Sequence, residues 1–187
     1  MPEPLYFNNQ FLIAMPMLMD PNFFRTVIYI CEHNESGAIG ITINRPLTVT
    51  LSDVLSQMNI TSSNADVNGL PVLFGGPIHQ ERGFVIHQPV GNWRSSVVTA
   101  DNLAVTTSQD VLEAIADEKG PEDYVISLGY SGWQPGQLEA EIANNYWLYC
   151  PVNTDILFHV PFGDRWMAAA ALIGVDVNRL SNDVGHG

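Results

Sequence analysis

Two neighbouring apolar segments of different periodicity constrain the fold of this chain most strongly. Thr26–His33 is apolar without a break over most of its length, which is typical of a strand covered on both faces. Turn-forming residues occupy 34–37, and isoleucine then alternates with small or polar residues over 39–43. That alternation predicts a half-buried strand, and the short turn between the two segments predicts an antiparallel hairpin.

The rest of the chain alternates further strand pairs with a small number of helices. Strands are expected at Phe11–Ala14, Val72–Phe74, Gly83–His87, Ser96–Thr99, Leu103–Thr106, Tyr124–Leu128, Trp147–Cys150 and Ile156–Val160. Helices are expected at Ser52–Met58, Ser108–Lys119, Gly136–Asn145 and Pro161–Ile173, with a polar loop at Thr61–Gly69 and a loose tail at Ser181–Gly187. The regular spacing of βαβ units is missing, so we expect a mixed α+β fold with a largely antiparallel sheet.

The charge balance limits which partners the chain can bind. It contains 20 acidic and 7 basic residues among 187, a net charge of −13. Proteins that bind nucleic acid gain affinity by placing Lys and Arg at phosphates, and anionic membrane surfaces attract the same side chains. We therefore expect no direct contact with nucleic acid and none with a membrane surface.

Length and cysteine content point to one reduced domain. A chain of 187 residues can bury a core without disulfides or metal, and no linker divides it, so residues 1–187 are expected to form a single domain. Cys31 and Cys150 are far apart in apolar surroundings, as free buried thiols are. The N-terminal residues lack the charge and length of a signal peptide, so a cytoplasmic location is expected.

Several short segments, in this order and spacing, resemble the YqgE/AlgH family of bacterial proteins over about Leu5 to Asp183. These segments are Phe11–Pro16, Gly37–Gly40, Asn44–Pro46, Gly75–Pro77, Gly129–Trp133 and Gly136–Glu139. The resemblance implies a bifurcated sheet curled into a pseudo-barrel with about four helices outside. It implies no particular reaction. Some members carry a name tied to transcriptional regulation, and with this charge any such regulation is expected to be indirect.

The same segments supply a candidate binding surface. It consists of Asn44, Arg45, Gly75, Gly76, Trp133, Gln137 and Glu139. Arg45 could hold an anion or a partner carboxylate, or form a salt bridge. The two glycines permit a positive-φ turn or a close backbone crossing. Trp133 is expected to be a packed anchor and Gln137 a solvent-facing or loop-tethering residue. Glu139 is expected at the third helical position, close to unpaired N–H groups.

Catalytic patterns in the sequence are incomplete. Gly129–Trp133 resembles the nucleophile elbow G-x-S-x-G around Ser131, but Trp133 occupies the last glycine position and the helix begins too late. Cys31 and His33 are two residues apart and are expected to share a strand face, yet a metal site needs further ligands.

Three functions remain open from the sequence. The first is a regulatory or adaptor module that binds a protein or small ligand without catalysis or a cofactor. The second is a hydrolase or metal-dependent enzyme whose site assembles from distant residues such as Asp20, His33, Ser131 and Glu139. The third is a transcriptional regulator that acts indirectly. The oligomeric state is left open.

Overall fold

The computed structural model describes the backbone of residues 5–183 and the side chains of residues 5–180. Ten strands form a sheet with the order β10-β1-β2-β3-β9-β6-β8-β7, and β4 and β5 join it through β9. The strands are β1 Gln10–Ala14, β2 Val27–Asn34, β3 Gly37–Thr42, β4 Pro46–Thr50, β5 Pro71–Phe74, β6 Ile78–Gln88, β7 Ser96–Ala100, β8 Leu103–Thr106, β9 Asp123–Trp133 and β10 Trp147–Pro151. All pairings are antiparallel except that of β5 with β9. The predicted α+β class and hairpin are confirmed.

Seven α-helices and one 3₁₀ turn occur in the described residues, more than the four helices expected. They are α1 Leu51–Gln57, α2 Ala65–Asn68, α3 Gln109–Ala116, α4 Gln137–Ala143, α5 Thr154–Phe158, the 3₁₀ turn Phe162–Asp164, α6 Arg165–Leu172 and α7 Val177–Asp183. None of these helices combines the length and hydrophobicity needed to cross a lipid bilayer.

Two expectations about local structure are wrong because asparagine side chains cap short helices in both places. The segment expected as strand Ile156–Val160 begins within α5, where the Asn153 side chain accepts a hydrogen bond from the Ile156 backbone N–H. The expected loop Thr61–Gly69 contains α2, capped in the same way by Asn64. The expected loose tail is partly helical, since α7 reaches Asp183, and residues 184–187 lie outside the described part of the chain.

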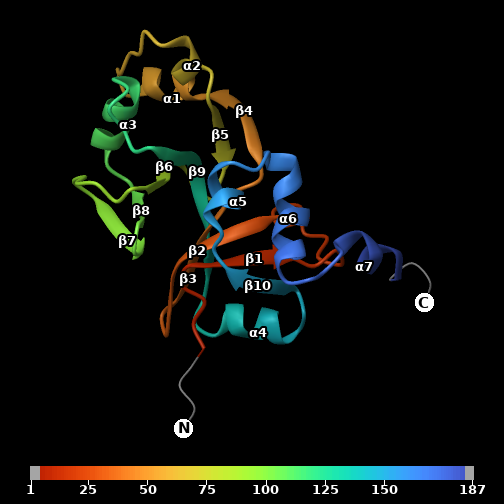
Figure 1. The fold of residues 1–187 in the computed structure, drawn as a ribbon. Helices are drawn as coiled ribbons and strands as arrows, with labels where there is room; N and C mark the ends of the chain where they lie inside the picture. The colour runs from red at the N-terminus through yellow and green to blue at the C-terminus, as the bar shows by residue number, and fades with distance from the viewer. Residues whose placement is uncertain (1–4, 184–187) are drawn as a thin grey trace.

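Strand β9 holds the two halves of the sheet together. Its last residues, 131–133, pair with β3, whereas its earlier residues pair with β6 on one edge and β5 on the other. The halves diverge from this shared strand, with β1, β2, β3 and β10 on one side and β6, β7 and β8 on the other (Figure 1). The bifurcated, curled sheet predicted by the family resemblance is confirmed.

Side-chain hydrogen bonds link the edge strand β7 to β2, which lies in the other half of the curled sheet. The hydroxyl of Tyr29 is fully buried and hydrogen-bonds both Thr99 Oγ1 on β7 (2.6 Å) and Asn9 Oδ1 beside β1 (2.7 Å). Burial raises the pKa of Tyr29, so this hydroxyl stays neutral. The hydrogen bonds of one phenol thus join strands that are five places apart in the sheet.

Glycines allow the strands to cross closely at the branch. Gly129 has φ +79° within β9, and a side chain there would collide with the carbonyl oxygen of Gly76. A side chain at Gly75 would in turn meet the carbonyl oxygen of Gly129. The predicted role of the Gly75-Gly76 pair in a close backbone crossing is confirmed. The chain continues through Gly129–Trp133 as strand, so the tight turn that a nucleophile elbow needs is not formed there.

Candidate functional site

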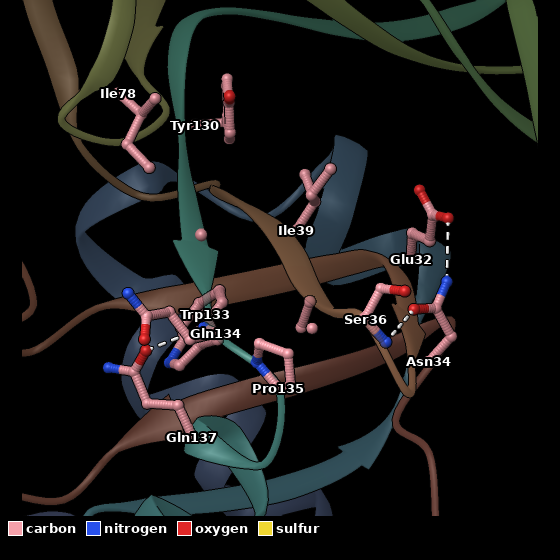
Figure 2. Close-up of a pocket in the computed structure, with 13 residues that line it drawn as sticks. Glu32, Asn34, Ser36, Ile39, Ile78, Tyr130, Trp133, Gln134, Pro135 and Gln137 are labelled. Carbon is pink, nitrogen blue, oxygen red and sulfur yellow. Dashed lines mark hydrogen bonds between the residues drawn. The ribbon is translucent and has the colours of Figure 1, made fainter.

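A pocket of about 560 Å³ opens where the β2–β3 turn, the end of β9 and the start of α4 meet (Figure 2). Its lining comes from three separate segments of the chain, 32–39, 78 and 130–137. The lining residues are Glu32, Asn34, Ser36, Gly37, Ala38, Ile39, Ile78, Tyr130, Gly132, Trp133, Gln134, Pro135 and Gln137. Its volume lies within the range typical of sites that bind small molecules or side chains.

The floor of the pocket is apolar. Ile39 comes from β3, Ile78 from the start of β6 and Tyr130 from β9, and in the view of Figure 2 all three lie above the corner formed by Trp133, Gln134 and Gln137. Ile78 is 36% exposed, so its side chain offers apolar surface at the pocket.

One polar rim is the turn between β2 and β3. The Asn34 Nδ2 group donates to Glu32 Oε1 (3.1 Å), and Asn34 Oδ1 accepts from the backbone N–H of Ser36 (2.8 Å). Gly37 follows with φ +127°, and a side chain there would collide with the carbonyl of Trp133. The turn therefore lies directly against the end of β9, and this contact requires glycine.

The other polar rim is the corner between β9 and α4. Gln137 Oε1 accepts from the backbone N–H of Gln134 (2.9 Å), while Gln137 Nε2 donates to Glu141 Oε2 (3.0 Å). The expected loop-tethering role of Gln137 is what the structure shows. Trp133 is 5% exposed and donates its indole N–H to Glu141 Oε1 (3.1 Å), as an anchor would. These hydrogen bonds fix the rim before any ligand arrives.

A second pocket of about 380 Å³ adjoins the first and shares Glu32 and Ile39 with it. It lies between the two halves of the sheet. The remaining lining residues are Cys31, Ile41, Phe84, Arg94, Ser95, Ser96, Val97, Thr99, Val105 and Thr107. We refer to the two pockets together as the groove, which runs from the start of α4 into the curled sheet.

His33 and Glu139 form a pair beside the groove. His33 Nδ1 accepts from the backbone N–H of Phe7 (2.9 Å), so Nε2 carries the proton and donates to Glu139 Oε1 (2.6 Å). Glu139 lies at the third helical position as expected, but its carboxylate meets His33 rather than the helix N–H groups. Both ring nitrogens of His33 are occupied, and the pair anchors residues 7–8.

The expectation that Cys31 and His33 share a strand face is wrong. A bulge between Ile30 and Glu32 shifts the register of β2, so Cys31 packs against the core that includes Tyr29, whereas His33 stacks on Phe7 in a different core. Burial raises the pKa of the Cys31 thiol to about 12. Among the described side chains, no cluster of three or more His, Cys, Asp or Glu could hold a metal.

Ser131 and Asp20 do not join this pair. Ser131 is 1% exposed within β9, and its hydroxyl has no hydrogen-bond partner among the described residues. Asp20 accepts from the backbone N–H of Asn22 (2.8 Å) in a loop. The four residues considered for an assembled enzyme site therefore provide no nucleophile held by a base within the described chain.

The candidate surface predicted from the sequence divides between two places. Trp133 and Gln137 line the groove, Gly76 packs behind it against Tyr130, and Glu139 follows on α4. Gly75 lies farther along, where its carbonyl accepts from the Thr42 N–H (2.8 Å).

Asn44 and Arg45 follow the opposite end of β3 from the groove. Asn44 bridges Val27 and the Arg25 carbonyl, and Arg45 donates to the carbonyls of Pro21 (2.6 Å) and Phe24 (2.8 Å). Burial lowers the pKa of Arg45, and Asp20 opposes that shift. No ion pair of Arg45 with a carboxylate occurs within 4.0 Å among the described residues, so its guanidinium holds a loop rather than a salt bridge.

Sequence reasoning missed most of the groove. Asn34 and Ser36 carried a signal only as turn formers, and Gln134-Pro135 only as a break before a helix. Ile78 carried no signal, because its segment was not expected to be strand. The groove arises where these distant turns meet, and a single sequence does not reveal that contact.

Comparisons with known proteins assign the chain to a family. The model of the AlgH-like family matches residues 11–178. A UPF0301 protein from Nitrosococcus oceani is 52% identical over 181 residues, covering 97% of each chain. The solution structure of the AlgH protein from Pseudomonas aeruginosa superimposes with a TM-score of 0.81 at 46% identity, covering 100% of this chain and 99% of that one.

A crystal structure of a protein from Corynebacterium diphtheriae has the same fold at 20% identity, with a TM-score of 0.74 over 97% of this chain and 94% of that one. The family resemblance found in the sequence is thus confirmed by the family model, by full-length relatives and by solved structures. The chain belongs to the AlgH-like family of bacterial proteins.

Proposed function

We propose that this protein is a regulatory or adaptor module whose groove receives an extended, positively charged segment of a partner protein. The observation that carries the proposal is the groove itself, with its apolar floor between two polar rims. In this proposal the protein acts in the cytoplasm, without catalysis or a cofactor, and any effect on transcription is indirect.

Charge supports a basic occupant. Among the side chains that the structure describes, Glu32 is the one charged group lining the larger pocket, and it also lines the smaller one. Arg94 at the smaller pocket lies 3.8 Å from Asp110, so its charge is partly balanced. The net charge of −13 steers cationic partners toward the molecule.

The rims support a polypeptide occupant. Asn34, Ser36, Gln134 and Gln137 present amide and hydroxyl groups, which recognise backbone N–H and C=O groups as well as polar side chains. Exposed Ile78 and the ring of Tyr130 offer apolar contact to alternate side chains of an extended segment.

The test compares two charge reversals that are three residues apart. Glu32→Lys changes the groove, whereas Glu35→Lys makes the same change at an exposed residue of the turn that does not line it. Each variant and the unchanged protein are used to capture proteins from cells of the source bacterium. Captured proteins are cross-linked and mapped by mass spectrometry.

The proposal expects a partner whose basic segment cross-links to the groove, and whose capture survives Glu35→Lys but falls at least tenfold with Glu32→Lys. A synthetic peptide of that segment should bind more weakly as salt rises. Equal capture by the two variants, or cross-links that all lie outside the groove, would refute it.

A further inference from the structure

Arg165, the first residue of α6, is a buried cation without a carboxylate partner in the described part of the chain. Arg165 is only 2% exposed to solvent. Nε donates to the Val160 carbonyl (2.8 Å) and Nη1 to the Ile43 carbonyl (2.8 Å), and both acceptors are neutral. No described Asp or Glu lies within 4.0 Å of its guanidinium nitrogens.

The guanidinium has hydrogen-bonding capacity left over. It carries five N–H donors in a planar fork, and none of the described residues accepts a hydrogen bond from Nη2. The Phe162 ring lies 4.5 Å from the guanidinium carbon and covers one face. Burial lowers the pKa of Arg165 to about 10, and no neighbouring acid offsets that effect. A buried charge in this condition favours an anionic partner.

Arg165 lines a small pocket of about 160 Å³ between β5, β9 and α5. Apart from Arg165 and Tyr124, its lining is apolar. The apolar residues are Leu70, Pro71, Leu73, Val125, Ile126, Phe158 and Phe162. The Tyr124 hydroxyl makes no hydrogen bond within the described residues, and burial raises the pKa of Tyr124, so it remains a neutral donor.

Acidic groups near the pocket are engaged elsewhere. Asp123 accepts from Gln88 Nε2 (2.9 Å) and lies 3.4 Å from His159 Nε2. Asp164 precedes Arg165 in the chain but is exposed at the surface. Neither carboxylate neutralises the buried guanidinium directly.

We propose that this pocket binds a small monocarboxylate with an apolar body. The carboxylate accepts from Arg165 Nη2 and from the Tyr124 hydroxyl, and the body lies among Leu73, Phe158 and Phe162. A planar carboxylate matches the guanidinium fork, whereas a phosphate dianion would leave most of its oxygens facing apolar side chains. This site is separate from the groove and shares no lining residue with it.

The experiment uses isobutyrate as the probe and isobutyramide as its neutral counterpart of equal shape. Each is titrated into the full-length protein, and the Arg165 Nε–Hε resonance is followed by NMR. Isobutyrate should produce a saturable shift at millimolar concentration, and isobutyramide and inorganic phosphate should not. Absence of a saturable shift with isobutyrate, or an equal shift with isobutyramide, would overturn the proposal.

Variants separate binding from folding. Tyr124→Phe removes one donor without changing the packing and should weaken isobutyrate binding several-fold. Arg165→Met should abolish it, with Arg82→Met as a control that removes an exposed cation lining neither this pocket nor the groove and leaves binding unchanged. If Arg165→Met fails to fold, Tyr124→Phe still decides the matter, because unchanged affinity in that variant contradicts the proposed contact.

Discussion

At the scale of single residues, two glycines with similar positive φ angles have different surroundings. Gly129 and Gly136 have φ of +79° and +76°. A side chain at Gly129 would collide with the carbonyl of Gly76, whereas nothing lies within 4 Å of one at Gly136. The pair therefore compares a positive-φ glycine in open space with one packed against another part of the backbone.

We expect Gly136→Ala to lower the free energy of unfolding by about 1 kcal/mol, the cost of the left-handed conformation for a residue with a Cβ. Gly129→Ala should lower it by more than about 3 kcal/mol, because the branch of the sheet must also move. Urea denaturation of both variants measures the difference. Equal losses would mean that the crossing of β5 and β9 adapts freely.

His87 is the residue whose titration should be visible in stability. It is fully buried, with Nδ1 donating to the Pro89 carbonyl (3.0 Å) and Nε2 hydrogen-bonded to Thr106 Oγ1 (2.7 Å). Burial lowers the pKa of His87, and the Pro89 carbonyl only partly opposes this shift. The unfolded chain therefore takes up a proton at this histidine before the folded chain does.

Since the unfolded state binds the proton first, stability is retained above pH about 6.5 and falls as the pH drops below that value. His87→Gln, which keeps a donor and an acceptor but does not titrate there, should lose less stability between pH 7.5 and 5.5 than the unchanged protein. His79→Gln, at an exposed histidine, is the control. A pH dependence unaffected by His87→Gln would contradict the prediction.

At this scale the sequence predicted the role of a single residue better than it predicted which residues share a strand face or contact each other. The packing of Trp133 and the tethering by Gln137 follow from residue type and helix position, and both are present. The prediction that Cys31 and His33 share a strand face failed because a bulge adds one residue to β2, and nothing in the apolar pattern of the sequence marks that bulge. The contact of Glu139 with His33 joins residues 106 apart and has no local signal.

At the scale of elements, the hydrogen bond from Tyr29 to Thr99 determines how firmly β7 is held. β7 is an edge strand that pairs only with β8 in the described sheet. Thr99→Val removes the hydroxyl and should cost about 1 kcal/mol of stability. It should also speed amide hydrogen exchange in β7 and β8 more than in β2, because the edge hairpin opens first.

The control is Thr48→Val, the same change at an exposed position of β4. Exchange rates in β7 and β8 that match those of the control would show that the hydroxyl does not hold the edge strand.

Element types could be predicted where a regular apolar pattern continued over many residues, as in α3 and the β2–β3 hairpin. They were missed in α2 and α5, which have four and five residues and depend on asparagine caps.

At the scale of the whole molecule, net charge is the property that the sequence states most directly. Because the chain of 187 residues carries a net charge of −13, we expect no retention of the protein on duplex DNA at physiological salt. Fluorescence anisotropy with labelled duplexes measures this. Tight, sequence-selective binding under these conditions would contradict both the charge argument and an indirect role in regulation.

The position of β9 in the chain also bears on how the protein can be made. Synthesis delivers β3 and β6 long before residues 123–133, yet both strands pair with β9. Strand β5 pairs with β9 as well, so a chain still attached to the ribosome presents unpaired edges of β3, β5 and β6 until β9 emerges, and such edges promote association with other chains. Translation of the segment from β8 to β9 is the interval in which a nascent-chain chaperone would protect this protein most.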